Sequence, residues 1–173
     1  DRVADELLQC STVYYNAHHE GDETTGTIDR SKEITLLAQK VAAGEAAKNK
    51  VRDDLDVIKN LRKNAEVGPL GDAILGALKH LMKSDSFSQA QVRRIPSMAT
   101  AAIDASRPIL ARMKDQFGEL DDNYVSLSDL VVNVCLSVCI KYANETNDFK
   151  EIIPVLNRLG GLKMTFETRS RFT

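Results

Sequence analysis

Two cysteines and a short histidine run are the residues of this sequence whose types and spacing could bind a metal. Cys135 and Cys139 are four residues apart, so on a helix both thiols would lie on the same face, as half of a zinc site. His18, His19 and Glu20 are the ligands that could complete it. Neighbouring residues on a helix point about 100° apart, however, so the two imidazoles would not both face one ion unless the helix has ended there. Small buried thiols are the favoured interpretation, and we predict no metal and no cofactor.

The motifs that carry common catalytic chemistry are absent from the sequence. It has no Gly-rich phosphate loop, no G-x-S-x-G, no H-E-x-x-H and no paired E-x-x-H. His80 stands alone on the polar side of an amphipathic segment, and no carboxylate is singled out by an apolar setting. We therefore predict a protein that is not an enzyme and that has no catalytic residues.

Composition and charge weigh against a dedicated nucleic-acid binder. Aromatic residues make up 5% of the 173 residues, Trp is absent, and the net charge is −2. Base-stacking platforms depend on aromatic faces, and nucleic-acid binders usually carry a basic excess. A local basic patch is compatible with this balance, and its candidates are Arg93, Arg94, Arg169 and Arg171. Three cysteines cannot form a complete set of disulfides within one chain, which favours a reducing compartment such as the cytoplasm.

A helix from about residue 2 to 19 is predicted by apolar residues at spacings of three and four. These residues are Val3, Leu7, Cys10, Tyr14 and Ala17. Ala4, Leu8 and Tyr15 widen the stripe, and we expect it to pack against more than one neighbouring helix. The segment "EGDETTGT" that follows is polar and contains two glycines, which predicts an exposed loop.

The longest predicted helix runs from about residue 30 to 66, where Gly44 alone interrupts the pattern at a cost of about 1 kcal/mol. A seven-residue alternation persists through Ile34, Leu37, Val41, Gly44, Lys48, Val51, Leu55, Ile58, Arg62 and Ala65. Two of these core positions are charged, which a free coiled coil would tolerate poorly. We therefore expect a helix of about 55 Å that lies along a bundle and overhangs it at the charged positions.

The most apolar stretch is "SLSDLVVNVCLSVCIKYAN", from Ser126 to Asn144. As a membrane span it is short, because only the residues from Leu130 to Ile140 are free of charge and about 20 are needed. As a strand it would lack a partner, although β-branched residues are frequent in it. As a helix from about 127 to 143 it would be apolar around nearly its whole circumference. We favour a buried central helix and expect no membrane span.

Capping patterns and prolines predict where the other helices begin and end. Capping boxes, in which two side chains satisfy the first turn, are expected to start at Ser88, Ser126 and Asp148. Pro96 and Pro108 are expected to divide their region into two or three short helices. Residues 162–173 show no helical period and are predicted to be an extended or partly disordered tail.

Together these patterns predict an all-α protein, with a single-domain helical bundle of about five to seven helices over residues 1–161. The lack of catalytic motifs and the overhanging helix favour a non-enzymatic interaction or scaffold domain that mediates protein–protein assembly, including self-association through the long helix. The candidate interaction face comprises Lys48, Leu55, Ile58, Lys59, Arg62 and Lys63. Binding of nucleic acid or an anionic surface through the basic patch, as in a nucleoprotein, is the alternative.

Overall fold

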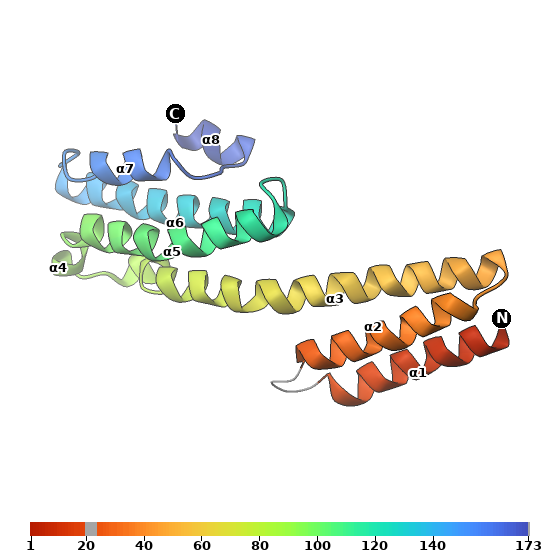
Figure 1. Cartoon of the computed structure of the whole chain (residues 1–173). Helices are drawn as coiled ribbons and strands as arrows, with labels where there is room; N and C mark the ends of the chain where they lie inside the picture. The colour runs from red at the N-terminus through yellow and green to blue at the C-terminus, as the bar shows by residue number, and fades with distance from the viewer. Residues whose placement is uncertain (20–23, 173) are drawn as a thin grey trace. The chain divides into compact units, whose positions relative to one another are not determined.

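The computed structural model describes residues 1–19 and 24–172, and in this part of the chain it contains helices and no strand (Figure 1). The elements are α1 (Arg2–His18), α2 (Thr24–Val41), α3 (Glu45–Leu78), the 3-10 helix η1 (Leu81–Ser86), α4 (Gln89–Val92), α5 (Ile95–Phe117), α6 (Asp122–Thr146), α7 (Ile153–Leu159) and α8 (Phe166–Phe172). The predicted all-α fold class is confirmed. The chain forms two compact units, Asp1–Gly68 (unit 1) and Pro69–Thr173 (unit 2), where the sequence predicts one domain.

The predicted long helix is two helices, α2 and α3, with a break at residues 42–44. The carboxylate of Asp1 accepts hydrogen bonds from the backbone N–H groups of Ala43 and Gly44, each at 3.1 Å. It thereby satisfies donors next to the start of α3. A Cβ on Gly44 would lie 2.6 Å from the Oδ2 atom of Asp1, so this close approach uses the missing side chain of glycine. The seven-residue alternation continues across the break and gives no sign of it.

The ends of α2 and α3 also differ from the sequence prediction. α2 begins at Thr24, inside the segment predicted as a loop, and the rest of that segment, residues 20–23, lies outside the described residues. α3 continues past the expected end near residue 66, through Pro69, to Leu78. Proline has no N–H to donate within a helix, and the boundary between the two units falls directly before Pro69. This proline therefore marks the unit boundary and not a helix end.

In unit 1, α1 and α2 pack through small and hydroxyl-bearing residues. The Ser11 hydroxyl donates to the carbonyl of Ser31 at 2.9 Å, and the Thr35 hydroxyl donates to the Ser11 hydroxyl at 2.9 Å. All three side chains are buried. The apolar cluster of unit 1, which joins these helices to α3, consists of Leu8, Ala38 and Val51. Because the distance between packed helices depends on the side chains at their contact, small residues allow the two backbones to approach closely.

α6 is the central helix of unit 2 and packs against η1, α4, α5, α7 and α8. Its buried residues are Tyr124, Ser128, Val131, Val132, Cys135, Leu136, Val138, Cys139, Tyr142 and Ala143. The Asp121 carboxylate caps its start by accepting from the N–H groups of Asn123 at 3.0 Å and Tyr124 at 3.2 Å. Asn147 ends it in the left-handed conformation, with φ at 54°. The predicted buried helix is confirmed, and it is longer at both ends than expected.

α6 is also the one helix in the described part of the chain that is long and apolar enough to cross a membrane by length and composition. Its most apolar window has a mean hydropathy of 1.5, and 44% of that window is buried inside the protein. The short uncharged run therefore understates how apolar this helix is. A helix surrounded by other helices has the same composition, and the absence of a membrane span stays a prediction.

The prolines of α5 and α7 either lie in the first turn of a helix or are accommodated inside it, and none of them divides a helix. Pro96 lies in the first turn of α5, and Pro154 lies in the first turn of α7. Pro108 lies inside α5, which is one helix of 23 residues and not two or three short ones. The capping box at Ser88 is confirmed, because the Gln91 side chain accepts the backbone N–H of Ser88 at 2.9 Å.

The Asp129 side chain holds the C-terminal tail and does not cap α6. Its carboxylate accepts hydrogen bonds from the N–H and the hydroxyl of Thr165, at 2.9 and 3.1 Å, and from the hydroxyl of Thr168 at 2.8 Å. The Asn133 amide donates to the same carboxylate at 3.0 Å and accepts from Arg171 at 2.8 Å. The tail that the sequence predicts to be extended is thus folded as α8 and docked on α6.

Candidate protein-interaction surface

The apolar stripe of α1 faces solvent more than it faces the core. The residues that α1 buries are Ala4, Leu8 and Ser11. Val3 and Cys10, which the spacing predicts to be packed, directly precede two of these positions and are exposed. Within that stripe, Leu7 packs against the apolar cluster of unit 1. The predicted orientation is therefore wrong for Val3 and Cys10, and the buried side of α1 is the part of the widened stripe that contains Ala4 and Leu8.

α2 shows the same inversion of small and large residues. It buries Thr27, Ile28, Ser31, Thr35 and Ala38. Leu37 is 50% exposed, and Val41 is exposed to a similar degree, although the seven-residue alternation places both in the core. Beyond the break the alternation is correct, because Val51 and Ile58 of α3 are buried. The break at residues 42–44 therefore separates a stretch where the repeat fails from one where it holds.

Contacts with α3 show on which side of the α1–α2 pair the exposed apolar residues lie. Asp5 of α1 and Asp29 of α2 each directly follow a buried residue. Asp5 accepts a hydrogen bond from Lys50 of α3 at 2.8 Å, and Asp29 accepts one from Arg62 of α3 at 2.7 Å. Successive residues of a helix are about 100° apart, so positions that follow the buried ones face α3. Positions that precede them, apart from Leu7 and Thr27, therefore face the opposite side.

That opposite side, which we call the outer face, gathers apolar residues from both helices. Its members are Val3, Cys10, Tyr14 and Ala17 on α1 and Ile34, Leu37 and Val41 on α2. Figure 1 shows α1 and α2 side by side and antiparallel, so the two stripes run along one another. The outer face is thus a two-helix apolar surface that α3 does not cover.

The charges beside the outer face are mostly paired within one helical turn. Arg2 lies 3.0 Å from Glu6 on α1, and Arg30 lies 2.5 Å from Glu33 on α2. Lys40 borders the same shallow surface hollow as Leu37. Exposed pairs of this kind contribute about 0–1 kcal/mol to stability. Their main effect here is a border that is close to neutral.

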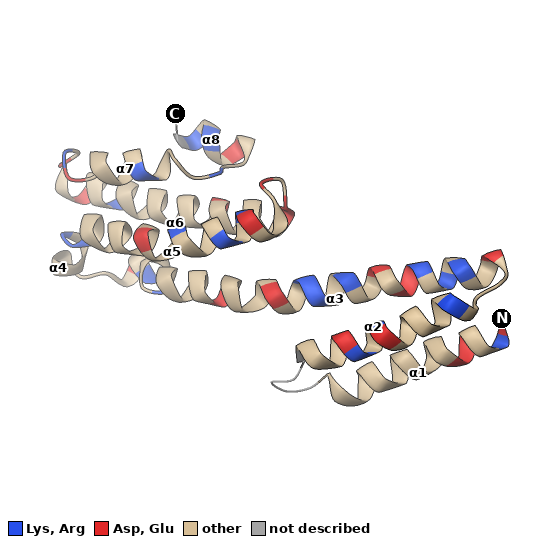
Figure 2. Ribbon diagram, in the orientation of Figure 1, with Lys and Arg blue, Asp and Glu red and all other residues tan. Residues whose placement is uncertain are grey.

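The interaction face predicted on the long helix lies on α3, and its two apolar members point inward. Ile58 is buried, and Leu55 packs against the apolar cluster of unit 1. The other predicted members are Lys48, Lys59, Arg62 and Lys63, and Figure 2 shows blue and red residues interleaved along this helix. The exposed apolar residue of this region is Val57. An interaction through this face stays a prediction, but Leu55 and Ile58 already contribute to the core of unit 1.

The four arginines of the predicted basic patch come from two separate parts of unit 2. Arg93 and Arg94 lie between α4 and α5, whereas Arg169 and Arg171 lie on α8 (Figure 2). Arg171 is engaged with the side chain of Asn133, and Arg93 lines a hollow together with three carboxylates. Binding of nucleic acid through these residues stays a prediction.

Cys135 and Cys139 are buried thiols inside unit 2. Burial raises the pKa of Cys135 to about 12 and the pKa of Cys139 to about 11. Within residues 1–19 and 24–172, no group of three His, Cys, Asp or Glu side chains is placed to hold a metal ion. Nδ1 of His18 and of His19 hydrogen-bonds to a backbone carbonyl one turn earlier, at 2.9 and 3.1 Å. Glu20, the third residue of the run, lies outside the described residues.

We expect one thiol to react in the folded protein and three to react after unfolding. Cys10 is exposed, so an alkylating agent modifies it at neutral pH. Cys135 and Cys139 are covered by neighbouring helices and remain protonated at that pH, and they react only in denaturant. Mass spectrometry after a short labelling pulse gives the number of modified thiols. Rapid labelling of either buried cysteine would contradict the central position of α6.

Asp54 is the carboxylate of unit 1 whose protonation we expect to affect stability. It lines a groove between α1 and α3 beside Val57 and Ile58. Burial raises the pKa of Asp54, the charge of Asp53 raises it further, and Lys50 lowers it by a smaller amount. A group whose pKa is raised by folding favours the protonated folded state. Its ionisation therefore destabilises the fold above that pKa, and the penalty disappears as the pH falls through the unfolded value near about 4.

Replacing this carboxylate by a neutral amide removes the penalty. We expect Asp54→Asn to melt at a higher temperature than the parent at pH 7 and at the same temperature at about pH 3. Thermal unfolding followed by circular dichroism at both pH values measures the difference. A variant that melts lower than the parent at pH 7 would show that the ionised carboxylate stabilises unit 1.

The outer face presents exposed apolar side chains inside a nearly neutral border, and burial of such a surface in a contact is favourable. The sequence analysis missed this surface, since it assigned the same residues to the core. Comparisons with protein families, with curated proteins and with solved structures gave no match.

Proposed function

We propose that this chain is a non-enzymatic helical assembly protein whose unit 1 binds a second copy of the chain through the outer face. The supporting observation is the partial inversion of α1 and α2, in which Ala, Ser and Thr pack inside beside Leu8 and Ile28 while Val3, Leu37 and Val41 stay exposed. Contiguous exposed apolar surface is characteristic of protein–protein contacts. The proposal keeps the assembly function predicted from the sequence and moves its interface from α3 to α1 and α2.

The size of the outer face is suited to a weak dimer. α1 and α2 contain 17 and 18 residues, and at 1.5 Å per residue each helix is about 25 Å long. Two helices packed about 9 Å apart present a face about 20 Å wide. Two such faces would bury about 1,000 Å² in total, which is at the lower limit for specific complexes. We therefore expect a dimer that dissociates on dilution.

The charge distribution favours a second copy over a partner of strong opposite charge. Arg2 with Glu6 and Arg30 with Glu33 neutralise each other within one copy, so two outer faces meet with little repulsion. A two-fold symmetric pair brings the same apolar residues together from both sides. Two α1–α2 hairpins then pack as four helices, an arrangement that covers both stripes.

Light scattering on a matched pair of variants tests this assembly. Leu37→Lys places a charge on the outer face, and Val57→Lys makes the same change on α3 at a position of similar exposure, 56% against 50%. We expect the parent and Val57→Lys to approach twice 19.1 kDa at about 100 µM. Leu37→Lys adds a charge on both sides of a symmetric contact and should stay near 19.1 kDa, with a dimer Kd weakened at least about a hundredfold.

A parent protein that remains monomeric at every concentration would contradict the proposal. Loss of the dimer in Val57→Lys but not in Leu37→Lys would place the interface on α3 instead. Circular dichroism spectra of the three proteins should agree, because both substituted positions are exposed. A variant whose spectrum changes is replaced by Val41→Lys on the outer face, which is exposed in the same way.

A further inference from the structure

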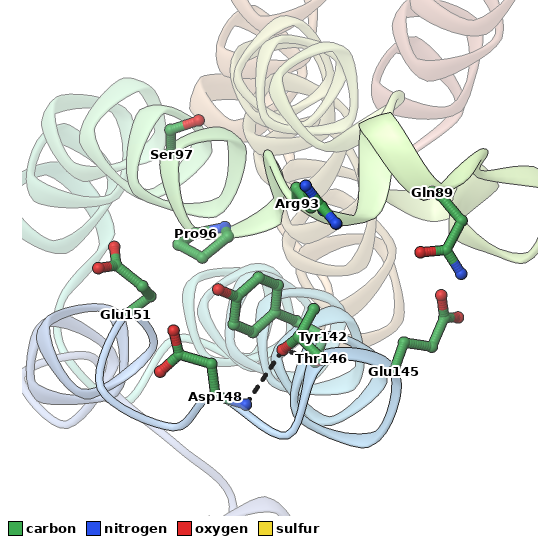
Figure 3. A pocket seen from close by; sticks show the side chains of 9 residues that line it. All are labelled: Gln89, Arg93, Pro96, Ser97, Tyr142, Glu145, Thr146, Asp148 and Glu151. Atoms are coloured by element: carbon green, nitrogen blue, oxygen red, sulfur yellow. Dashed lines mark hydrogen bonds between the residues drawn. The ribbon is translucent and has the colours of Figure 1, made fainter.

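Unit 2 contains a solvent-open hollow of about 560 Å³ between the end of α6 and the start of α5 (Figure 3). Arg93, Tyr142, Asp148 and Glu151 are among the residues that line it. Binding sites for small molecules typically have volumes of about 300–1,000 Å³. The hollow includes Arg93, a member of the predicted basic patch, and its lining is predominantly polar.

The phenol ring of Tyr142 lies at the bottom of this hollow. The residue is only 6% exposed, and its hydroxyl has no hydrogen-bond partner among the described residues. Figure 3 shows the hydroxyl pointing toward the side of the hollow where Asp148 and Glu151 lie. Tyrosine hydroxyls in buried residues usually have a partner. Within the described residues no buried side-chain oxygen lacks a partner, so this hydroxyl is open to the hollow and available to a polar group bound there.

Opposite charges line the hollow, and two of them are not engaged in ion pairs within the protein, whereas Glu145 is paired with Lys141 at 3.6 Å. Arg93 and Glu151 form no ion pair with any residue that the structure describes. One oxygen of Asp148 accepts a hydrogen bond from the backbone N–H of Lys150 at 3.0 Å, and this bond closes a turn before α7. The capping box predicted to start at Asp148 does not form, because the residue that caps α7 is Ile152. Its carboxylate still faces the hollow in Figure 3. The hollow therefore presents a cation on one wall and carboxylates on another.

We propose that this hollow binds a small zwitterionic ligand with a guanidinium or primary ammonium group at one end and a carboxylate at the other. This is the chemistry of a basic amino acid, either free or at the C-terminus of a peptide. The cationic end donates to Asp148, Glu151 and the Tyr142 hydroxyl, and the carboxylate accepts a bidentate pair of hydrogen bonds from Arg93. The site belongs to unit 2 and is independent of self-association through the outer face.

Calorimetric titration of the full chain with L-arginine and with agmatine, which lacks the carboxylate, tests both ends of the site. We expect saturable binding of L-arginine with a Kd of about 1 mM or below. Arg93→Ala should weaken L-arginine about tenfold and leave agmatine unchanged. Glu151→Gln and Tyr142→Phe should weaken both ligands at least about fivefold. Glu167→Gln, which changes an exposed carboxylate on α8, is the control and should bind as the parent does.

A tripeptide ending in Arg, titrated in parallel, distinguishes the two sources of this chemistry. Tighter binding of the tripeptide assigns the site to peptide C-termini, and tighter binding of L-arginine assigns it to the free amino acid. Absence of saturable heat for all three ligands up to about 10 mM would overturn the proposal. Equal affinities in the parent, Glu151→Gln and Tyr142→Phe would also overturn it, because binding would then occur elsewhere. Glu151 is exposed, so its variant keeps the test valid if the buried tyrosine does not tolerate substitution.

Discussion

Asp129→Ala releases α8 from α6 and accelerates hydrogen exchange of the α8 amides by about 30- to 100-fold. The Asp129 carboxylate accepts four hydrogen bonds, from the N–H and hydroxyl of Thr165, the hydroxyl of Thr168 and the amide of Asn133. Hydrogen bonds to a charged group contribute about 1.5–3 kcal/mol each and are not additive. Apolar packing adds little, because Phe166 is 88% exposed. We therefore expect the free energy of opening α8 to fall by about 2–3 kcal/mol.

Hydrogen exchange followed by mass spectrometry measures this effect on the peptide that contains residues 163–172. Asp129→Asn should give an intermediate acceleration, because the amide oxygen still accepts from Thr165. Asp115→Ala, at an exposed carboxylate on α5, is the control and should leave the exchange of α8 unchanged. Equal exchange of α8 in the parent and in Asp129→Ala would show that other contacts dock this helix.

Two adjacent residues of α2 are expected to respond in opposite ways to changes of size. Ala38 is fully buried against Leu8 and Val51, so Ala38→Leu overfills the contact and costs about 1–3 kcal/mol of unfolding free energy. Leu37 lies on the outer face, so Leu37→Ala should change the unfolding free energy of the monomer by about 0.5 kcal/mol or less. If the seven-residue alternation gives the true register, Leu37→Ala would lose more unfolding free energy than Ala38→Leu, because a buried Leu→Ala change costs about 2–5 kcal/mol.

Urea unfolding of the two variants, followed by circular dichroism, measures this difference. The protein concentration is kept at about 1 µM, so that dimer dissociation does not contribute to the apparent stability. Leu36→Ala, at a second exposed position of α2, is the control and should resemble Leu37→Ala. A larger loss for Leu37→Ala than for Ala38→Leu would mean that α2 is rotated relative to the structure described above.

The helices of this protein follow from local periodicity, but the direction in which some of them face does not. α6 was predicted correctly because it is apolar on nearly all sides, so any orientation places it in the interior. In α1 and α2 the hydrophobic pattern ranks Val and Leu above Ala, Ser and Thr, whereas packing of the close pair favours the small residues. The sequence does contain a sign of the buried side of α2, namely the helical spacing of the small residues Ser31, Thr35 and Ala38, which lie four and three residues apart.

The features that the sequence analysis missed depend on contacts between distant residues. Asp1 meets Gly44 and thereby forms part of the break between α2 and α3. Asp129 meets Thr165 and Thr168 and thereby folds the tail. A window of ten to twenty residues never contains both partners of such a pair, so periodicity and capping patterns predict a continuous helix and an extended or partly disordered tail. The hollow has the same origin, because Arg93 and Tyr142 belong to different elements.

The alkylation rate of Cys10 at different protein concentrations reports directly on coverage of the outer face. Cys10 is the exposed cysteine of the three and is a member of that face, so labelling needs no engineered thiol. Between about 1 and 100 µM protein, we predict that its rate constant falls at least about threefold in the parent and stays constant in Leu37→Lys. A rate constant in the parent that does not depend on concentration, measured where light scattering detects dimers, would show that the chains associate through another surface.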